Sequence, residues 1–542
     1  MNSLAALVLL VALSAPWPSF ALAAAGAARV DAADSSRAAA TGLDLQEVLD
    51  RHALAMGYSR EAGFDTALHI KAKVSGLGLH GTVESWNEAP LCGWSRLSLG
   101  PLSLESGYDG AQAWIMDRNG VVRDAPGNEE TGAILESIVN LGAYVLKRPP
   151  VPLFVKLAPP DESGRPRLSL QLLGKEPEYL TLDPSTFRLA ETSWNNGQME
   201  LKTVFEHYRE IDGTWIPDRI RMETGDMILS ASLELAEFAP TRGKDAYRPP
   251  PSRRDGPIFH GGSASGRLAM VGAGGHILLR GTLNRDHEGL FLLDTGAGSS
   301  ILDSTQLPQL GLSTQGELEA TGAAGNAPAA LVQIESLALG RMEFPAQSWV
   351  SLDLSSVTSL LSDETVTGVL GYDTLNQSII EIAYDQRWVQ FHSRRDFTPP
   401  SQAEEIPLRM DANVPTAKVS IEGITAWVHL DTGSDNELDL SAPFVQQHEL
   451  LKSENRGEMS PAGVRGIGGS SRALRGSLRR FELGSFVFED LPTNFSTSNE
   501  GVMGSTDVAG VLGAGILSRF HLFLDYASSR LWIERAGERA RG

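Results

Sequence analysis

Two stretches of the chain end in the same three residues. "FLLDTGAGSS" (291–300) and "AWVHLDTGSD" (426–435) each lead an apolar run into Asp-Thr-Gly, and the two aspartates are 137 positions apart. A carboxylate at the end of an apolar strand costs free energy unless it is hydrogen-bonded or paired. Glycine after it permits a tight turn and a close approach of another backbone. The chain must therefore fold so that both Asp294 and Asp431 find partners.

A second motif repeats downstream of each aspartate. Gly-Val-Leu-Gly occupies 368–371 and 510–513, which are 142 positions apart, and Tyr384 and Tyr526 share that offset. One Asp-Thr-Gly is readily explained as a surface turn, but two copies followed by the same motif are not. The pattern predicts an internal repeat with five extra residues between the two motifs of the second copy.

Two-fold pairing of the copies would bring Asp294 and Asp431 face to face. Two carboxylates about 3 Å apart repel by about 5 kcal/mol at an effective dielectric near 20. Such a pair shares one proton over a wide pH range. The ionised member can take a proton from a water that attacks a carbonyl, and the protonated member can donate to the carbonyl oxygen. This chemistry requires no metal and no cofactor, so we expect none.

The loops "LLDTGAGS" and "HLDTGSDN", each with its downstream "GVLG", resemble those of the retropepsin-like and pepsin-like aspartic proteases. The resemblance covers roughly residues 267 to 536. It implies a mainly β fold in which two retropepsin-like β-barrel lobes, 267–400 and 401–542, form a pseudo-dimer. It also implies that Asp294 and Asp431 are catalytic. A different arrangement, in which like lobes pair between two chains, stays open.

The resemblance extends to the neighbours of the aspartates. The threonines would cross-brace the two loops, the glycines would lie in the turns, and a serine would hydrogen-bond the aspartate of its own lobe, which Ala297 at the matching position cannot do. These supporting residues are Thr295, Gly296, Thr432, Gly433 and Ser434.

In this family a hairpin flap lies between the two motifs of each lobe. We expect the flaps at 319–330 and 460–476, where glycines suit a mobile hairpin tip. The second flap carries arginines in an acidic protein, which favours contact with acidic substrate groups, although a solvated hairpin face explains them equally well. The expected flap and substrate residues are Gly322, Gly325, Arg465, Gly466, Gly468 and Arg472.

The region ahead of the lobes has a different pattern. Apolar residues recur at helical spacing over 45–56, with Gly57 to end the helix, and again over 131–146. Residues 67–86 alternate as a β-hairpin does. This pattern predicts an α+β domain over residues 41–240. The domain resembles the half-barrel of bacterial lipoprotein-sorting proteins, which implies a curved antiparallel sheet. Such a sheet would suit contact with peptide or lipid, and a structural or pro-domain role is the alternative.

Short segments complete the organisation. An apolar run and the small-x-small triplet Ala21-Leu22-Ala23 predict a signal peptide over 1–25, and 241–266 is rich in Pro, Gly and charge, as linkers are. No later stretch is apolar for long enough to predict a membrane span. Cys92 is the only cysteine, which excludes an intramolecular disulfide. An exported chain without disulfides is typical of a bacterial periplasmic or secreted protein.

The net charge of the chain is −21, which argues against nucleic acid as a partner. The resemblance to aspartic proteases implies a peptide or protein substrate. We therefore predict an exported aspartic endopeptidase that hydrolyses peptide bonds with a water activated between Asp294 and Asp431. The alternative is a non-catalytic periplasmic binding or carrier protein that keeps the same fold. Intact Asp-Thr-Gly in both copies favours the enzyme.

Overall fold

The computed structural model divides the chain between positions 253 and 254 into two compact units, called here the N-terminal unit and the C-terminal unit. Both units are mainly β. The signal peptide predicted over 1–25 lies outside the described residues. The described residues are 44–61, 65–195, 200–225, 227–252, 256–272, 275–322, 325–358, 361–362, 364–452, 459–466, 469–498 and 502–537.

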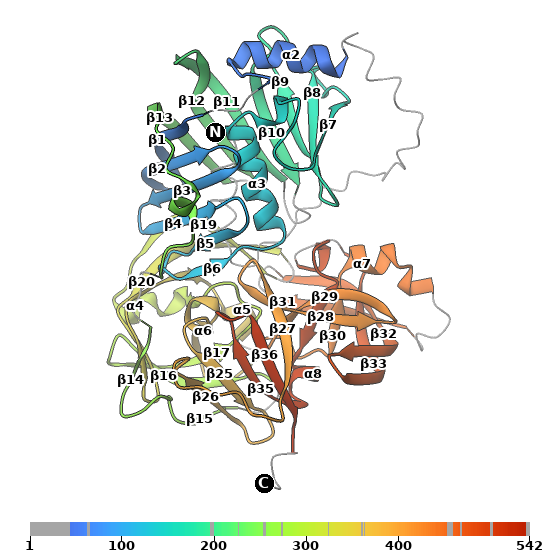
Figure 1. Ribbon diagram of the computed structural model, residues 1–542. Coiled ribbons are helices and arrows are strands. Elements are labelled where there is room, and N and C mark those ends of the chain that lie inside the picture. The colour runs from blue at the N-terminus through green and yellow to red at the C-terminus, as the bar shows by residue number, and fades with distance from the viewer. Residues whose placement is uncertain are drawn as a thin grey trace. The chain divides into compact units, whose positions relative to one another are not determined.

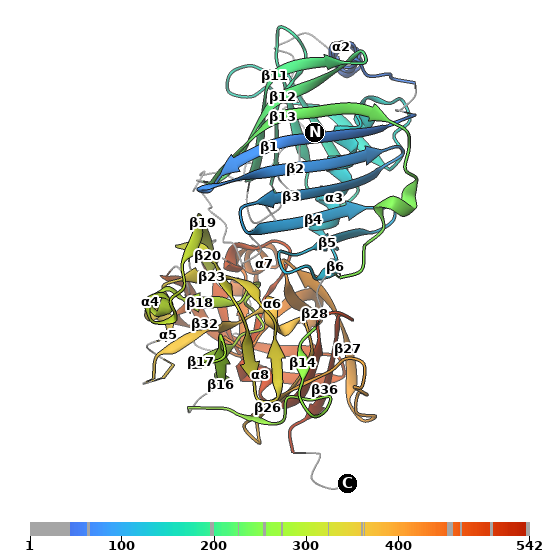
Figure 2. The same cartoon turned by 90° about the vertical axis from the view of Figure 1, so that its left-hand side faces the viewer.

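The N-terminal unit is built on one antiparallel sheet that curves around helix α3 (Figures 1 and 2). Its strand order is β6-β5-β4-β3-β2-β1-β13-β12-β11-β10-β9-β8-β7. The first and last strands, β1 and β13, therefore pair in the middle of the sheet, and α3 connects the two edge strands. The strands are β1 (Ala67–Gly76), β2 (Leu79–Glu88), β3 (Cys92–Leu99), β4 (Leu102–Tyr108), β5 (Ala113–Met116), β6 (Val122–Asp124), β7 (Leu153–Ala158), β8 (Arg167–Leu172), β9 (Glu178–Leu182), β10 (Leu189–Asn195), β11 (Glu200–Ile211), β12 (Thr214–Thr224) and β13 (Met227–Ala239).

The first helix begins and ends where the sequence predicts. Helix α2 (Leu45–Met56) starts after Asp44, whose carboxylate accepts a hydrogen bond from the N–H of Glu47 at 2.8 Å, and it ends at Gly57 with φ 77°. The hairpin predicted over 67–86 is β1 and β2. The helix predicted over 131–146 is α3 (Asn128–Asn140) followed by a 3-10 turn, η3 (Ala143–Val145), because the chain turns at Gly142 with φ 59°.

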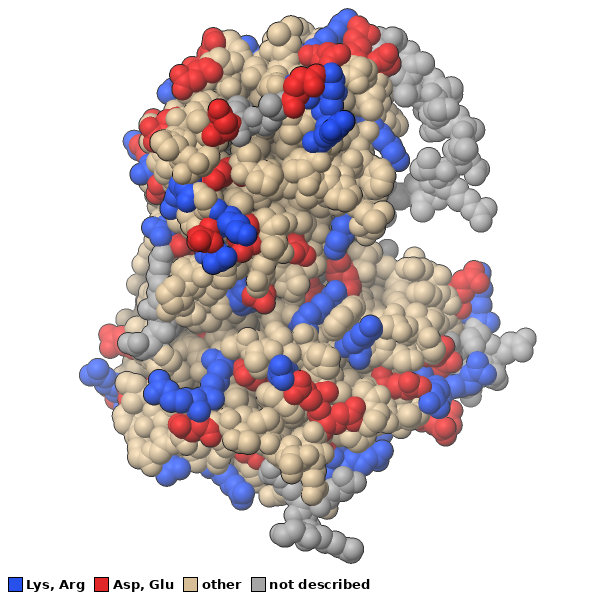
Figure 3. All heavy atoms as spheres, viewed as in Figure 1, with Lys and Arg blue, Asp and Glu red and all other residues tan. Residues whose placement is uncertain are grey.

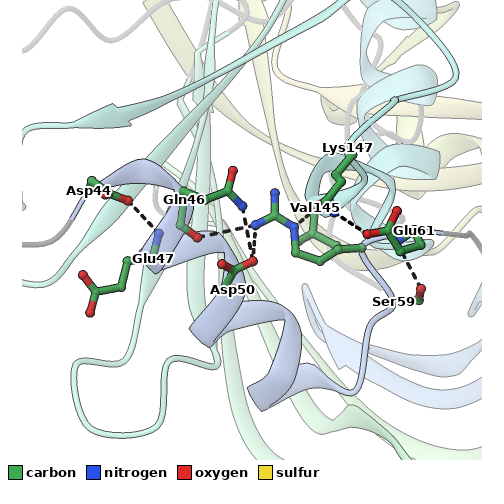
Figure 4. A network of polar contacts seen from close by, with 9 residues as sticks. Asp44, Gln46, Glu47, Asp50, Ser59, Glu61, Val145 and Lys147 are labelled. Carbon is green, nitrogen blue, oxygen red and sulfur yellow. Dashed lines mark hydrogen bonds and ion pairs between the residues drawn. The ribbon is translucent and has the colours of Figure 1, made fainter.

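Polar contacts tie α2 to the end of η3. Arg60 donates from Nη1 to Asp50 Oδ1 at 2.5 Å and from Nε to the carbonyl of Val145 at 2.9 Å, and Lys147 pairs with Glu61 (Figure 4). Behind them, the buried ring of His52 contacts Tyr144 Oη and the carbonyl oxygen of Phe187, both at 2.6 Å. Burial lowers the pKa of His52 to about 4, so this ring stays neutral at physiological pH.

Two of the buried glutamates in this unit have raised pKa values. Glu136 on α3 and Glu178 on β9 are 6% and 2% exposed. Burial raises the pKa of each to about 8, and Glu178 adds to the shift of Glu136. A carboxyl whose pKa is raised in the folded state stabilises the fold below its unfolded-state pKa, and this contribution is lost as the pH rises through the folded-state pKa.

The C-terminal unit contains two sheets. The first has the order β14-β22-β21-β16-β17-β24-β18-β23-β20-β19, and the second β15-β26-β25-β35-β36-β27-β28-β29-β34-β30-β33-β32-β31. The strands up to residue 400 are β14 (Ile258–Phe259), β15 (Leu268–Ala269), β16 (Leu278–Leu283), β17 (His287–Leu293), β18 (Ile301–Asp303), β19 (Thr314–Gly322), β20 (Gly325–Ile334), β21 (Leu337–Leu339), β22 (Met342–Phe344), β23 (Gln347–Leu352), β24 (Val366–Leu370), β25 (Ile379–Ala383) and β26 (Trp388–His392). The later strands are β27 (Glu404–Asp411), β28 (Val414–Ile421), β29 (Ile424–Asp431), β30 (Leu438–Leu440), β31 (Ser460–Gly466), β32 (Gly469–Leu483), β33 (Phe486–Ser496), β34 (Gly510–Gly513), β35 (Phe520–Asp525) and β36 (Arg530–Arg535).

Short helices connect these strands. They are η5 (Ser304–Gln306), α4 (Leu307–Leu310), α5 (Ser355–Thr358), α6 (Tyr372–Leu375), α7 (Ala442–Gln447), η6 (Leu450–Lys452), η7 (Val502–Gly504) and α8 (Ala514–Leu517). The stretch predicted as a linker, 241–266, contributes η4 (Lys244–Tyr247) to the N-terminal unit and β14 to the C-terminal unit.

The same strand pairings occur on both sides of residue 400. Strand β17 runs parallel to β24, which runs antiparallel to β18, which runs parallel to β23. In the later half, β29, β34, β30 and β33 pair in the same order and with the same directions. The two halves also share a sheet, because β25 of the first half pairs with β35 of the second. One large apolar core, which includes Phe291, Trp349, Phe391, Phe481 and Phe495, runs through both halves.

We predict that Glu136→Gln and Glu178→Gln each make the stability of the protein less sensitive to a rise in pH. Between about pH 4.5 and 8, each glutamate should decrease the free energy of unfolding by up to about 1.4 kcal/mol per pH unit, and glutamine removes that slope. Thermal unfolding of the full chain across this range measures it. Glu130→Gln, on the same helix but partly exposed, is the control. A wild-type slope that persists in both variants would contradict the assignment.

Candidate active site

The two Asp-Thr-Gly loops face each other in the C-terminal unit. Asp294 follows β17 and donates its N–H to the carbonyl of Leu370 at 3.1 Å, and Asp431 is the last residue of β29. A Cβ added to Gly296 would lie 2.5 Å from Asp431 Cγ, and one added to Gly433 would lie 2.6 Å from Asp294 Cγ. Each loop therefore packs its glycine against the carboxylate of the other loop, and no larger residue fits at either place.

The two threonines lock the loops together. Thr295 Oγ1 donates to the carbonyl of Leu430 at 2.7 Å and accepts from the N–H of Thr432 at 3.0 Å. Thr432 Oγ1 makes the reciprocal pair, to the carbonyl of Leu293 at 2.9 Å and from the N–H of Thr295 at 3.1 Å. Both side chains are 1% exposed. The four hydrogen bonds hold the ends of β17 and β29 at a fixed separation.

The carboxyl groups of Asp294 and Asp431 are hydrogen-bonded to each other. Both residues keep part of their surface exposed. Asp294 Oδ1 also accepts from the N–H groups of Gly296 at 2.8 Å and Ala297 at 3.1 Å, whereas Asp431 Oδ1 accepts from Gly433 at 2.7 Å. The additional backbone donor stabilises the charged form of Asp294 relative to that of Asp431.

The surroundings raise both pKa values, but not equally. Burial raises the pKa of Asp431 well above its ordinary value, and the charge of Asp294 raises it further. Burial also raises the pKa of Asp294, against the hydrogen bonds from Asp431 and the backbone. Two such carboxyls titrate as a pair and share one proton over a wide pH range.

Two tyrosines lie behind the loops. Tyr526 Oη donates to the carbonyl of Thr295 at 3.4 Å, and the buried hydroxyl of Tyr384 has no hydrogen-bond partner among the described residues. Burial raises both pKa values far above the ordinary value, and the charge of Asp431 adds to each shift. Both phenols therefore stay neutral next to the carboxylates. Tyr384 and Tyr526 occupy matching positions in the two copies of the repeat. The repeat alone does not indicate that they lie near the aspartates.

The predicted flaps form hairpins. Strands β19 and β20 pair up to Gly322 opposite Gly325, and β31 and β32 pair up to Gly466 opposite Gly469. Gly468 lies outside the described residues, as does the side chain of Arg465. Arg472 on β32 is exposed.

Two side chains near the second loop have contacts that the sequence did not predict. Arg475, the third arginine of the second flap region, donates from Nη2 to Glu437 Oε2 at 2.8 Å, so it has an acidic partner within the protein. Ser434 Oγ accepts from the N–H of Asn436 at 3.4 Å. Its hydrogen bond to Asp431 stays a prediction.

Over the described part of the chain, no group of three or more His, Cys, Asp or Glu side chains is placed to hold a metal ion. No helix among the described residues is long and apolar enough to cross a membrane. Lys and Arg side chains are interspersed with Asp and Glu on the face drawn in Figure 3.

We predict that Thr295→Ala and Thr432→Ala each lower the free energy of unfolding by roughly 2–5 kcal/mol. Either change leaves a buried carbonyl and a buried N–H without a partner, each at a cost of about 1–3 kcal/mol. The matched variants Thr295→Ser and Thr432→Ser keep the hydroxyl and should recover most of the loss. Chemical denaturation measures the difference. Equal stability of the alanine and serine variants would show that the four hydrogen bonds do not hold the loops.

Residues 279–374 match the model of a family described as aspartyl protease. This stretch contains the loop of Asp294 and the Gly-Val-Leu-Gly at 368–371, and it ends before the second loop. A comparison of the whole chain with curated proteins gave no match. The first half of the C-terminal unit is thus similar to aspartyl proteases, which supports a hydrolase of this type.

Proposed function

We propose that the protein is an aspartic endopeptidase in which a water held between Asp294 and Asp431 hydrolyses the peptide bond. The observation that carries the proposal is the hydrogen bond between two carboxyls that arrive on separate, cross-braced loops. Burying the carboxyls of Asp294 and Asp431 in contact destabilises the fold, so a site with a purely structural role has no reason to contain such a pair. The aspartyl protease match over 279–374 agrees with this chemistry.

The asymmetry of the pair supports a different role for each aspartate. Asp294 is ionised, because it accepts two backbone hydrogen bonds, and takes a proton from the water as the water oxygen attacks the substrate carbonyl carbon. Asp431 donates its proton to the carbonyl oxygen, which gives a neutral tetrahedral diol. The proton then held by Asp294 passes to the amide nitrogen as the C–N bond breaks. As this bond breaks, Asp431 takes a proton back from one hydroxyl of the diol, so the substrate leaves as a carboxylic acid and an amine and the pair again holds one proton.

The architecture proposed with this function is a single-chain pseudo-dimer. The repeated strand pairings around β17 and β29 support two equivalent lobes, each contributing one aspartate. The hairpins β19–β20 and β31–β32 lie next to β23 and β33 in corresponding places and are proposed as the flaps. We further propose that the chain is exported to the periplasm or secreted, with 1–25 as its signal peptide, and that the N-terminal unit contacts peptide or lipid.

We predict that Asp294→Asn and Asp431→Asn each abolish peptide hydrolysis without loss of the fold. The raised pKa values mean that stability is lost as the pH rises through them, so removing either carboxyl should leave the unfolding temperature at pH 7 unchanged or higher. Cleavage of a peptide library, analysed by mass spectrometry, measures activity. A statine-type mimic of the diol should block the wild type.

The control for this experiment is Asp286→Asn, which changes an exposed aspartate of the same unit. It should cleave as the wild type does. Near-wild-type turnover by either Asp294→Asn or Asp431→Asn would contradict the proposal. A wild type that binds the statine-type mimic but cleaves no library peptide would instead favour the alternative, a binding or carrier protein that keeps the fold.

We also predict that the second flap selects acidic substrates. Arg472 is exposed on β32, and an arginine–carboxylate hydrogen bond contributes about 1.5–3 kcal/mol. Arg472→Ser should therefore lower kcat/KM about tenfold for peptides with acidic residues near the cleaved bond, and little for neutral peptides. Arg480→Ser, an exposed arginine farther along the same strand, is the control. An equal loss of kcat/KM for acidic and neutral peptides would show that Arg472 only supports the hairpin.

A further inference from the structure

Two residues outside the motifs reach from one half of the C-terminal unit to the catalytic loop of the other half. His276 lies just before β16, and Asn413 lies in the turn between β27 and β28. They are 137 positions apart, the same offset as Asp294 and Asp431, and each precedes the aspartate of its own half by 18 positions. The two residues therefore occupy equivalent positions in the two copies.

Their contacts are equivalent as well. His276 Nδ1 lies 2.7 Å from Asp435 Oδ1, and Asn413 Nδ2 donates to the carbonyl of Gly298 at 3.2 Å. Asp435 and Gly298 are again 137 positions apart, and each lies four positions after the aspartate of its own loop. Each half thus makes the same kind of contact with the catalytic loop of the other half. One contact joins an imidazole to a carboxylate, and the other joins a side-chain amide to a backbone carbonyl.

Both contacts between the halves lie in closely packed surroundings. Asn413 is 5% exposed and is held in a two-residue turn with Ala412, both at positive φ (70° and 46°). On the other side, the His276 side chain is 18% exposed, and a Cβ on the neighbouring Gly275 would lie 2.7 Å from Asp435 Oδ1. Asn413 therefore holds the backbone of one catalytic turn directly, whereas His276 holds the other turn through the Asp435 side chain, which is 57% exposed.

A shift of that far end would disturb the reacting groups. Residue 435 is two positions after Gly433, whose N–H donates to Asp431 and whose Cα packs on the carboxylate of Asp294. Gly298 is likewise two positions after Gly296, whose N–H donates to Asp294. His276 contacts Asp435 and Asn413 contacts Gly298, so the effect of these two contacts on the carboxyls passes through the turns.

We propose that His276 and Asn413 are positioning residues of the catalytic pair, each holding from the opposite half the turn that carries the other half's aspartate. The inference rests on the proposed function. It implies that the turn of Asp431 depends on an imidazole–carboxylate contact, whereas the turn of Asp294 depends on an amide–backbone contact.

The test compares His276→Ala, His276→Asn and Asn413→Ala with the wild type. A misplacement of about 1 Å in an active site costs up to about a hundredfold in rate, so kcat should fall about 10- to 100-fold in the alanine variants while KM changes less than about threefold. His276→Asn should recover activity to within about threefold of the wild type, because asparagine performs the same function at position 413. His287→Ala, which removes the exposed His287–Asp286 contact in the same unit, is the matched control and should change neither parameter.

The outcomes separate the two hypotheses. Unchanged kcat in His276→Ala and Asn413→Ala, or a fall in unfolding temperature alone, would overturn the positioning role while the protease function stands. If His276→Ala does not fold, Asp435→Asn, which keeps the shape of the contact, takes its place. If the wild type cleaves no peptide, the proposed function fails. The positioning role is then tested by following the ¹³C resonance of the Asp431 carboxyl against pH in the wild type and in His276→Ala. A displaced titration midpoint in His276→Ala supports positioning, and superimposable curves overturn it.

Discussion

The hydrogen bonds that Thr295 and Thr432 exchange across the two loops are the interaction on which the site depends. Two carboxyls in contact repel by about 5 kcal/mol when both are ionised, and the loops would separate if nothing held them. The threonine hydroxyls bind the carbonyls of Leu430 and Leu293 and resist that separation. With the loops fixed, the repulsion is relieved by binding a proton, and this shared proton is what makes the pair chemically useful.

The rest of the C-terminal unit positions those loops. Parallel pairing of β17 with β24, and of β29 with β34, brings a Gly-Val-Leu-Gly strand beside each aspartate. The glycines of these strands are required, because a Cβ on Gly371 would lie 2.2 Å from the carbonyl oxygen of Ser299, and one on Gly513 would lie 2.2 Å from that of Asn436. The second motif of the sequence is therefore the structural support for the first.

Local patterns in the sequence predicted the parts of this structure that local physics determines. Helical periodicity with Asp44 and Gly57 at the ends located α2, and alternation located β1 and β2. The pairing of Asp294 with Asp431 was predicted because an apolar strand that ends in a carboxylate needs a partner, and a repeat supplies one. The role of the threonines was predicted from the resemblance to aspartic proteases. The cross-half contacts of His276 and Asn413 were missed, although the offset of 137 positions that relates the aspartates also relates them. The acidic partner of Arg475 lies 38 positions earlier on another element, and no local pattern indicates it.

A neutron crystal structure at neutral pH would locate the proton of the catalytic pair directly. We expect one proton between the carboxyl groups of Asp294 and Asp431, bonded to Asp431, with a water hydrogen-bonded to both residues. Two ionised carboxylates separated beyond hydrogen-bonding distance, or each paired with a different group, would contradict it.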